Sequence, residues 1–269
     1  MKPEIQVLGI SIKTFGVAFA FGFLACGLLV ARRLRELGRP VDWAYEITFA
    51  ALIGGVVGAR VYYLIQNADK LHGSVIVNIF SGAGLVWYGG AIGGAIAVVG
   101  WMRWRHVLEL RVLDMCATAL ALGYAIGRIG CQVSGDGDYG IRSTLPTSMG
   151  YPHGTVPTPP GVKVLPTPIY ETVLMCLLAW GLWQLRDRVR PGVVFALYLV
   201  GSGLERFLIE FIRRNKEVAL GLTAPQLESL FLVIAGLLWI GLLVRRGGFD
   251  SLRAEGAPRG RPAGRPATA

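Results

Sequence analysis

The chain has 269 residues, of which 53% are hydrophobic and 16% are charged, and its mean hydropathy is +0.52. Apolar runs of about 20 residues recur along it, which a soluble domain could not bury and which are typical of a multi-spanning membrane protein. The net charge of +10 comes with no nucleic-acid-binding motif. It therefore indicates contact with anionic lipid headgroups, and nucleic acid is excluded as the expected partner.

Taken in chain order, seven apolar segments are expected to be transmembrane helices: 12–31, 43–65, 84–102, 112–132, 168–185, 191–212 and 225–244. The expected fold is all-α, that of a polytopic integral membrane protein with about seven transmembrane helices. Residues 1–246 would form the membrane domain, and the Pro-, Gly- and Thr-rich segment 134–167 would form an external loop. Residues 247–269 contain no apolar run and are expected to be a disordered basic cytoplasmic tail.

The orientation follows from the loops that carry arginine. "ARRLRELGRP", "RWRHVLELR", "RDRVRP" and the C-terminal tail all follow odd-numbered spans. Because basic loops face the cytoplasm, the N-terminus is expected outside and the C-terminus inside. The basic stretch "RRNKE" falls on the opposite side, between the last two spans. This exception indicates a functional or lipid-contacting role for that stretch.

Several ionisable side chains fall within or at the edges of the spans: Glu46, Arg60, Asp114, Arg128, Glu171, Glu205, Arg206 and Glu210. A charge at the centre of a transmembrane helix costs about 2.5–3.5 kcal/mol on insertion scales, so these groups should face the protein interior and pair. For Glu46, Arg60 and Asp114, ion pairs that only hold helices together explain the pattern as well as function does.

The segment "LERFLIEFIRR" places three charges on one helix face. Arg206, Glu210 and Arg213 follow one another at i, i+4 and i+7, with apolar residues between them. This pattern predicts a helix that lines a polar cavity, in which Glu210 holds the arginines in place.

Arg128 stands at the end of a long apolar run, before the glycine-rich stretch "GCQVSGDGDYG". A guanidinium matches the geometry of a phosphate, and the glycines allow a ligand to approach the backbone closely. We therefore expect Arg128 and Arg206 to bind a phospholipid headgroup. The alternative is that Arg128 pairs with Asp136 or Asp138 and only fastens the loop.

These motifs resemble those of the bacterial phosphatidylglycerol–prolipoprotein diacylglyceryl transferases. The similar segments, in the family's order, are "GGVVGARVYYLI", "GLVWYGGAIGG", "GRIGCQVSGDGDYG", "PTPIYE", "RFLIEFIRR" and "GLTAPQLESL". The resemblance runs from about residue 12 to residue 244. It implies a multi-pass protein of the bacterial inner membrane that needs no cofactor.

The resemblance implies transfer of the diacylglyceryl group of phosphatidylglycerol to the lipobox cysteine of a preprolipoprotein signal peptide, with release of glycerol phosphate. Arg128 and Arg206 match the family's essential arginines, and Tyr88 joins them as a catalytic candidate. The expected substrate-binding residues are Arg128, Arg206, Glu210, Arg60, Asp136, Tyr170 and Glu171. No metal site is expected, because the three histidines are scattered.

Some positions depart from the family pattern. Tyr88 stands where relatives commonly have histidine, Cys131 where they have asparagine, and Leu165 where they have histidine. The group that deprotonates the acceptor thiol is therefore open: the lipid phosphate, Tyr88, Asp136 and His153 are candidates. Two other functions also stay open, a non-catalytic protein that binds or moves anionic lipid and a paralogous transferase with a different acceptor.

Overall fold

The computed structural model describes residues 1–7, 10–67, 87–245 and 252. Seven long helices lie within these residues: α1 Thr14–Glu36, α2 Trp43–Gln66, α4 Trp87–Trp104, α5 Leu110–Ser134, α6 Thr167–Leu185, α7 Val193–Glu210 and α8 Ala224–Arg245. Two short antiparallel hairpins accompany the helices. β1 Glu4–Val7 and β2 Ile10–Lys13 precede α1, and β3 Glu217–Ala219 and β4 Leu222–Thr223 lie between α7 and α8. The expected tail lies outside the described residues, apart from Leu252.

The helical, membrane-type fold expected from the sequence is confirmed. Four helices are long and apolar enough to cross a bilayer: Thr14–Glu36, Trp43–Ile65, Leu110–Ser134 and Ala224–Arg245. Their outer surfaces carry large apolar side chains, such as Phe21, Leu28 and Ile53, which are 60%, 62% and 60% exposed. An exposed apolar surface of this extent is suited to lipid and not to water.

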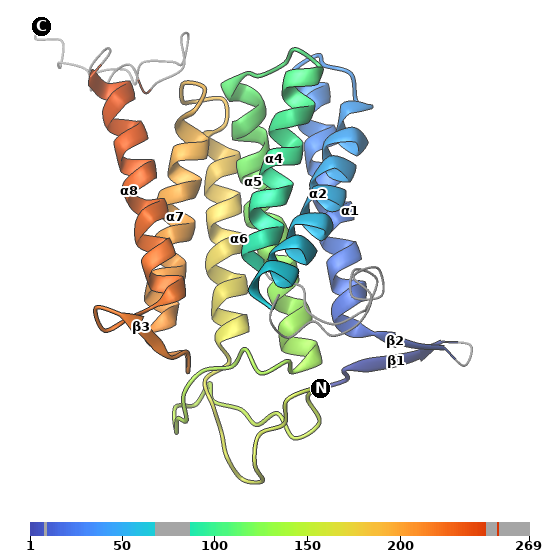
Figure 1. Cartoon of the computed structure of the whole chain (residues 1–269), viewed down its shortest axis with the longest axis vertical. Helices are drawn as coiled ribbons and strands as arrows, with labels where there is room; N and C mark the ends of the chain where they lie inside the picture. The colour runs from blue at the N-terminus through green and yellow to red at the C-terminus, as the bar shows by residue number, and fades with distance from the viewer. Residues whose placement is uncertain (8–9, 68–86, 246–251, 253–269) are drawn as a thin grey trace, which may run out of the picture.

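The helices pack in a row whose centre is α5 (Figure 1). Among the described elements, α4 packs on α2, α2 on α1, α1 on α5, and α5 on both α6 and α7, while α8 packs on α7. Ala117, Ala121 and Ala125 recur every fourth residue on α5 and are fully buried against α6 and α7. Because alanine is small, this face lets three helices meet closely at the centre of the row.

The contact between α2 and α4 is made by glycines. A Cβ atom added to Gly58 would lie 2.7 Å from the Cα of Gly93, and one added to Gly93 would lie 2.7 Å from the Cα of Gly58. Gly54 and Gly89 come equally close to the backbone of the facing helix. The two backbones therefore touch along this crossing, as the small-xxx-small spacing of the sequence predicts.

Two of the intramembrane acids hold helices together. Asp114 accepts hydrogen bonds from the backbone N–H groups of Gly192 and Phe195, at 2.7 and 2.8 Å, where α7 begins. Glu46 accepts a bond of 2.7 Å from the indole N–H of Trp101 and pairs with Arg105, which joins α2 to α4. The contacts of Asp114 and Glu46 are those of residues that hold neighbouring helices together.

Both hairpins and the segment 135–166 lie at one end of the row, and the C-terminal end of α8 lies at the other (Figure 1). Gly135 ends α5 in the left-handed conformation, with φ +61°, and turns the chain across the helix end. Beyond it, the rings of Tyr139 and Tyr151 stack with their centroids 4.8 Å apart, and the Tyr151 hydroxyl donates to Gln132 at 2.8 Å. The loop is thereby packed against the end of α5, and its Asp138 pairs with Arg128.

Candidate active site

The candidate site lies where three helix ends meet at the loop-bearing end of the row. Because α6 runs antiparallel to α5 and α7, the end of α5, the start of α6 and the end of α7 lie at the same level (Figure 1). These ends carry Arg128, Glu171, Arg206 and Glu210, and Arg213 follows α7 directly. The antiparallel packing thus collects charges that are up to 85 positions apart in the sequence, from Arg128 to Arg213.

Glu171 is the centre of this cluster. Its side chain is fully buried. Oε1 lies 3.0 Å from Nη1 of Arg213 and 3.9 Å from Nη1 of Arg206, while Oε2 pairs with Arg128 and accepts a hydrogen bond of 2.8 Å from Tyr124. One buried carboxylate therefore contacts three guanidinium groups. It holds Arg128 and Arg213 by short, charge-assisted contacts and Arg206 by a longer ion pair.

Arg128 is held from three sides. It pairs with Glu171 and with Asp138, and Nη2 donates to the Tyr124 hydroxyl at 2.9 Å, with the guanidinium 4.9 Å from the centre of the same ring. The alternative contact expected from the sequence is thus present, with Asp138 as the partner. Asp138 also pairs with Arg213 at 2.5 Å, so this loop acid links the two arginines.

Arg206 keeps a free donor. Nη2 lies 3.0 Å from Oε2 of Glu210, which is the i, i+4 pair that the sequence predicts. Glu210 is in turn fixed by Asn215 and Thr223, which donate to its Oε1 at 2.6 and 2.8 Å. Nη1 of Arg206, by contrast, is buried and makes no hydrogen bond within the described part of the chain. A buried donor of this kind is costly unless a ligand satisfies it.

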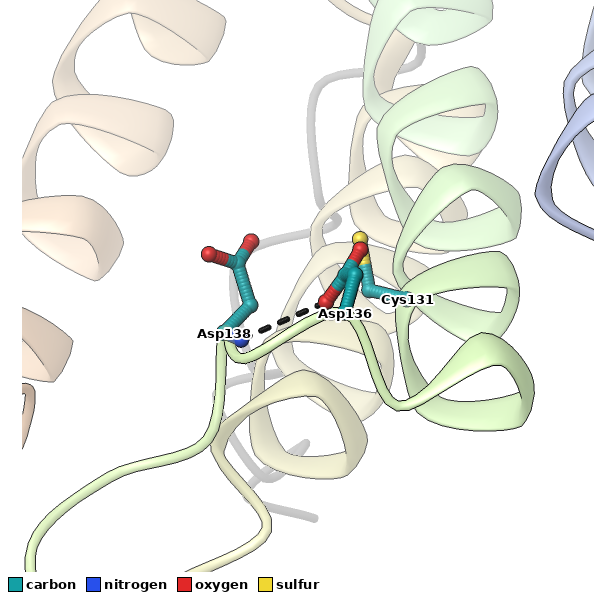
Figure 2. A group of neighbouring side chains, drawn as sticks. All are labelled: Cys131, Asp136 and Asp138. Atoms are coloured by element: carbon teal, nitrogen blue, oxygen red, sulfur yellow. Dashed lines mark hydrogen bonds between the residues drawn. The ribbon is translucent and has the colours of Figure 1, made fainter. Parts of the chain in front are cut away.

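The loop contributes two aspartates with different environments (Figure 2). Burial by itself would raise the pKa of Asp138, but the guanidinium groups of Arg128 and Arg213 outweigh it and hold that pKa below its usual range. Burial raises the pKa of Asp136, which lies beside Cys131 and whose Oδ1 accepts the backbone N–H of Asp138 at 3.3 Å. Asp138 is therefore the loop carboxylate that forms ion pairs with the arginines.

Cys131, Asp136 and Asp138 also form a group with the spacing of metal ligands. Their sulfur and carboxylate atoms lie within 4.8 Å of one another (Figure 2). The carboxylate of Asp138 is already shared by Arg128 and Arg213, and the positive charge of these groups opposes a cation at the same place. We therefore interpret these residues as part of the arginine cluster.

The remaining candidates from the sequence are Tyr170, Arg60, Tyr88 and His153. The hydroxyls of Tyr170 and Thr147 share a hydrogen bond of 2.6 Å, which ties α6 to the loop. Arg60 is buried on α2, with its guanidinium 5.2 Å from the ring centre of Tyr63. Tyr88 is the second residue of α4, but its side chain lies outside the described part of the structure. His153 is exposed in the loop.

Three residues of the cluster were not among the site residues predicted from the sequence. Arg213 belongs to the charged stripe at i+7 from Arg206, so the sequence did carry a signal for it. Tyr124 lies one helical turn before Arg128 and could have been found by the same spacing. Asp138 gave no signal beyond that of a loop acid, since its position depends on how the loop folds back.

The cluster as a whole can bind an anion that carries its charge on oxygen. Three preset guanidinium groups share their carboxylate partners, and one of these, Asp138, comes from a loop and is 35% exposed. An incoming phosphodiester can use the free Nη1 of Arg206 and can exchange with Asp138 at the other arginines.

Comparison with known proteins identifies the family of the chain. The model of the family "Prolipoprotein diacylglyceryl transferase" matches residues 3–242. A phosphatidylglycerol–prolipoprotein diacylglyceryl transferase of Clostridium tetani is 31% identical over 240 residues, covering 88% of this chain and 96% of that protein. A relative of the same name from Leptospira interrogans is 30% identical, over 77% of this chain and 73% of the relative. A third, from Dehalococcoides mccartyi, is 32% identical, over 82% of this chain and 85% of the relative.

The matched residues include the described helices, except for the last three residues of α8, and the complete arginine cluster. The chain belongs to the prolipoprotein diacylglyceryl transferase family.

Proposed function

We propose that this protein transfers the diacylglyceryl group of phosphatidylglycerol to the lipobox cysteine of prolipoproteins and releases glycerol phosphate. The observation that carries the proposal is the free, buried Nη1 of Arg206 within a cluster of three arginines. The names of the relatives supply the two substrates. A phosphodiester is the anion that such a cluster would meet within a bilayer.

All seven helices are proposed to cross the bacterial inner membrane, with the N-terminus outside and the C-terminus in the cytoplasm. The arginine-rich connections around Arg39, Arg105 and Arg186 lie at the end of the row away from the site. Since basic loops face the cytoplasm, the arginine cluster then lies at the level of the outer leaflet. The signal peptide of a prolipoprotein presents its cysteine at that level.

In the reaction, the thiol sulfur of the acceptor attacks the glycerol carbon that bears the phosphate. The carbon–sulfur bond forms while the carbon–oxygen bond breaks, and the electron pair of that bond moves to the phosphate oxygen. Arg206 and Arg128 would stabilise the negative charge that grows on this oxygen, more strongly in the transition state than in the bound lipid. Their fixed positions reduce the reorganisation that the transition state requires.

Glu171 and Glu210 are proposed to position the arginines, since each pairs with two or more of them. Asp138 would leave Arg128 when the phosphate arrives, and Gly137, with φ +96°, gives the adjoining backbone a conformation that few other residues adopt. Asp136, Tyr170, Arg60 and Tyr88 remain proposed contacts of the lipid or the peptide, on the basis of the family resemblance.

The test is complementation of a bacterium depleted of its own transferase, with mass spectrometry of a reporter lipoprotein. The wild-type chain is compared with Arg128→Ala, Arg206→Ala and the control Arg188→Ala, whose side chain is exposed at the opposite end of the row. Wild type and control should add a diacylglyceryl group to the reporter cysteine, and both site variants should fail to do so.

An expressed, folded wild-type chain that leaves the reporter unmodified would refute the proposal. Binding of phosphatidylglycerol that depends on Arg206, without transfer, would then favour a lipid-binding protein. Transfer to a different thiol or hydroxyl acceptor would favour a paralogous transferase.

A further inference from the structure

Glu205 precedes Arg206 on α7 and has no place in the mechanism described so far. Its side chain is buried, with 8% of the residue exposed, and its Oε1 makes no hydrogen bond within the described residues. The next residue, Arg206, likewise keeps a buried Nη1 without a hydrogen bond within the described residues. Glu210 Oε2 also lacks a hydrogen bond but is ion-paired with Arg206. A buried polar atom without a hydrogen bond is costly unless a ligand satisfies it.

Glu205 faces the interior of the row and not the lipid. It interacts electrostatically with Glu171 on α6, Arg128 on α5, Arg206 on its own helix and Arg213 beyond it. Tyr124 of α5 and Tyr198 of α7 interact with it as well. On α8, which packs against the other side of α7, the charged residues are Glu228 and Arg245.

The other acids of the cluster are occupied. Oε1 and Oε2 of Glu171 both contact arginines, Asp138 is shared by Arg128 and Arg213, and Glu210 pairs with Arg206 while it accepts from two polar side chains. An acid that is bound in this way cannot take up a proton without breaking those bonds. Glu205 retains an oxygen that can.

The reaction requires such an oxygen. The thiolate is the nucleophile, but a cysteine thiol has a pKa of about 8.5 and is mostly protonated at neutral pH. A general base placed beside the thiol raises the rate by roughly 10²–10⁴-fold.

We propose that Glu205 accepts the proton of the acceptor thiol during diacylglyceryl transfer; this inference rests on the function proposed above. The S–H proton moves to Glu205 Oε1 as the sulfur bonds to the glycerol carbon and the phosphate leaves with the electron pair of the C–O bond. Glu205 then passes the proton to the departing glycerol phosphate, which has gained one negative charge. The step balances without any further reagent.

The experiment measures transfer from phosphatidylglycerol vesicles to a synthetic lipobox peptide by the purified full-length protein. The peptide carries either cysteine or selenocysteine at the acceptor position. A selenol is ionised at neutral pH, so it needs no base. The variants are Glu205→Gln, which keeps the size of the side chain, Glu205→Asp, which keeps a carboxylate, and the control Glu109→Gln, which is exposed before α5 at the end of the row away from the site.

With the cysteine peptide at pH 7, Glu205→Gln should lower kcat roughly 100-fold, with little change in the KM for lipid. The deficit should shrink as the pH rises past the pKa of the thiol. With the selenocysteine peptide, the ratio of variant to wild-type kcat should return to within a few-fold of one. Glu205→Asp should lose less activity than Glu205→Gln, and the control should match wild type with both peptides.

An equal loss with both peptides and at every pH would overturn the proposal and assign Glu205 to packing or lipid binding. Full activity of Glu205→Gln would overturn it too. If Glu205→Gln does not fold, Glu205→Asp carries the same comparison, because a shifted carboxylate impairs cysteine more than selenocysteine. A wild type that modifies neither peptide would instead refute the proposed function, and this inference with it.

Discussion

The buried contact between Glu171 and Arg213 allows a quantitative test of how the cluster is held together. Oε1 of Glu171 and Nη1 of Arg213 are 3.0 Å apart, and both side chains are almost completely buried. At that distance two unit charges attract by about 5.5 kcal/mol at an effective dielectric constant of about 20. Glu171→Gln keeps the volume and some hydrogen bonds but leaves three arginines with one carboxylate fewer. We expect it to lower the free energy of unfolding by roughly 3–5 kcal/mol.

The matching variant is Arg213→Gln, which removes a positive charge from the same contact. Alone it should also destabilise, because Glu171 and Asp138 lose a partner. Together the two substitutions should cost less than the sum of the single ones, by roughly 1–3 kcal/mol, since neither leaves the other's charge unpaired.

The assay is equilibrium unfolding in mixed micelles with increasing dodecyl sulfate, followed by circular dichroism, for the wild type, both single variants and the double variant. Arg188→Gln serves as the control for loss of one arginine, because Arg188 is exposed and lies at the end of the row away from the cluster. If the single effects add to within about 0.5 kcal/mol, the two residues are not coupled and the account of Glu171 as the centre of the cluster is wrong.

Three further outcomes are expected. Gly58→Ala should destabilise the fold by roughly 1–3 kcal/mol in the same assay, because its Cβ would press on Gly93. The control Gly100→Ala, around whose added Cβ nothing lies within 4 Å, should leave the stability unchanged. Equal effects of the two variants would contradict the close crossing of α2 and α4. Burial alone would raise the pKa of Asp138, but its two arginines lower it, so its ion pairs stabilise the fold above about pH 4 and are lost as the pH falls through the lowered pKa. Asp138→Asn should therefore be less stable than wild type at pH 7, and the gap should close in acid; a gap that persists at low pH would argue against this. Arg206→Lys keeps the positive charge but loses the planar guanidinium with its two parallel donors, and it should reduce kcat roughly 100-fold. A lysine variant with wild-type kcat would show that the charge alone suffices.

The helices could be predicted from the sequence because their signal is local. Each is an apolar run, and the seven described helices overlap the seven predicted segments one for one. The charged stripe of α7 is equally local, so Arg206, Glu210 and the pairing between them follow from helical spacing alone. Arg128 and Glu171 were recognised as costly intramembrane charges.

What could not be predicted depends on contacts across helices. No spacing along the chain indicates that Glu171 would contact Arg128, Arg206 and Arg213 at once, because this requires α5, α6 and α7 to meet at one level. The choice of Asp138 as the partner of Arg128, in place of Asp136, depends on the fold of the loop. Arg60 is a costly charge like the others, but it lies on α2, which packs against α1 and α4.

The glycine contact between α2 and α4 also limits how a lipid can reach the arginines. Where the backbones of Gly58 and Gly93 touch, no acyl chain fits between the two helices. A lipid that reaches the arginine cluster from the side therefore has to pass elsewhere than through the α2–α4 crossing. This crossing is a closed part of the lateral surface of the helix row.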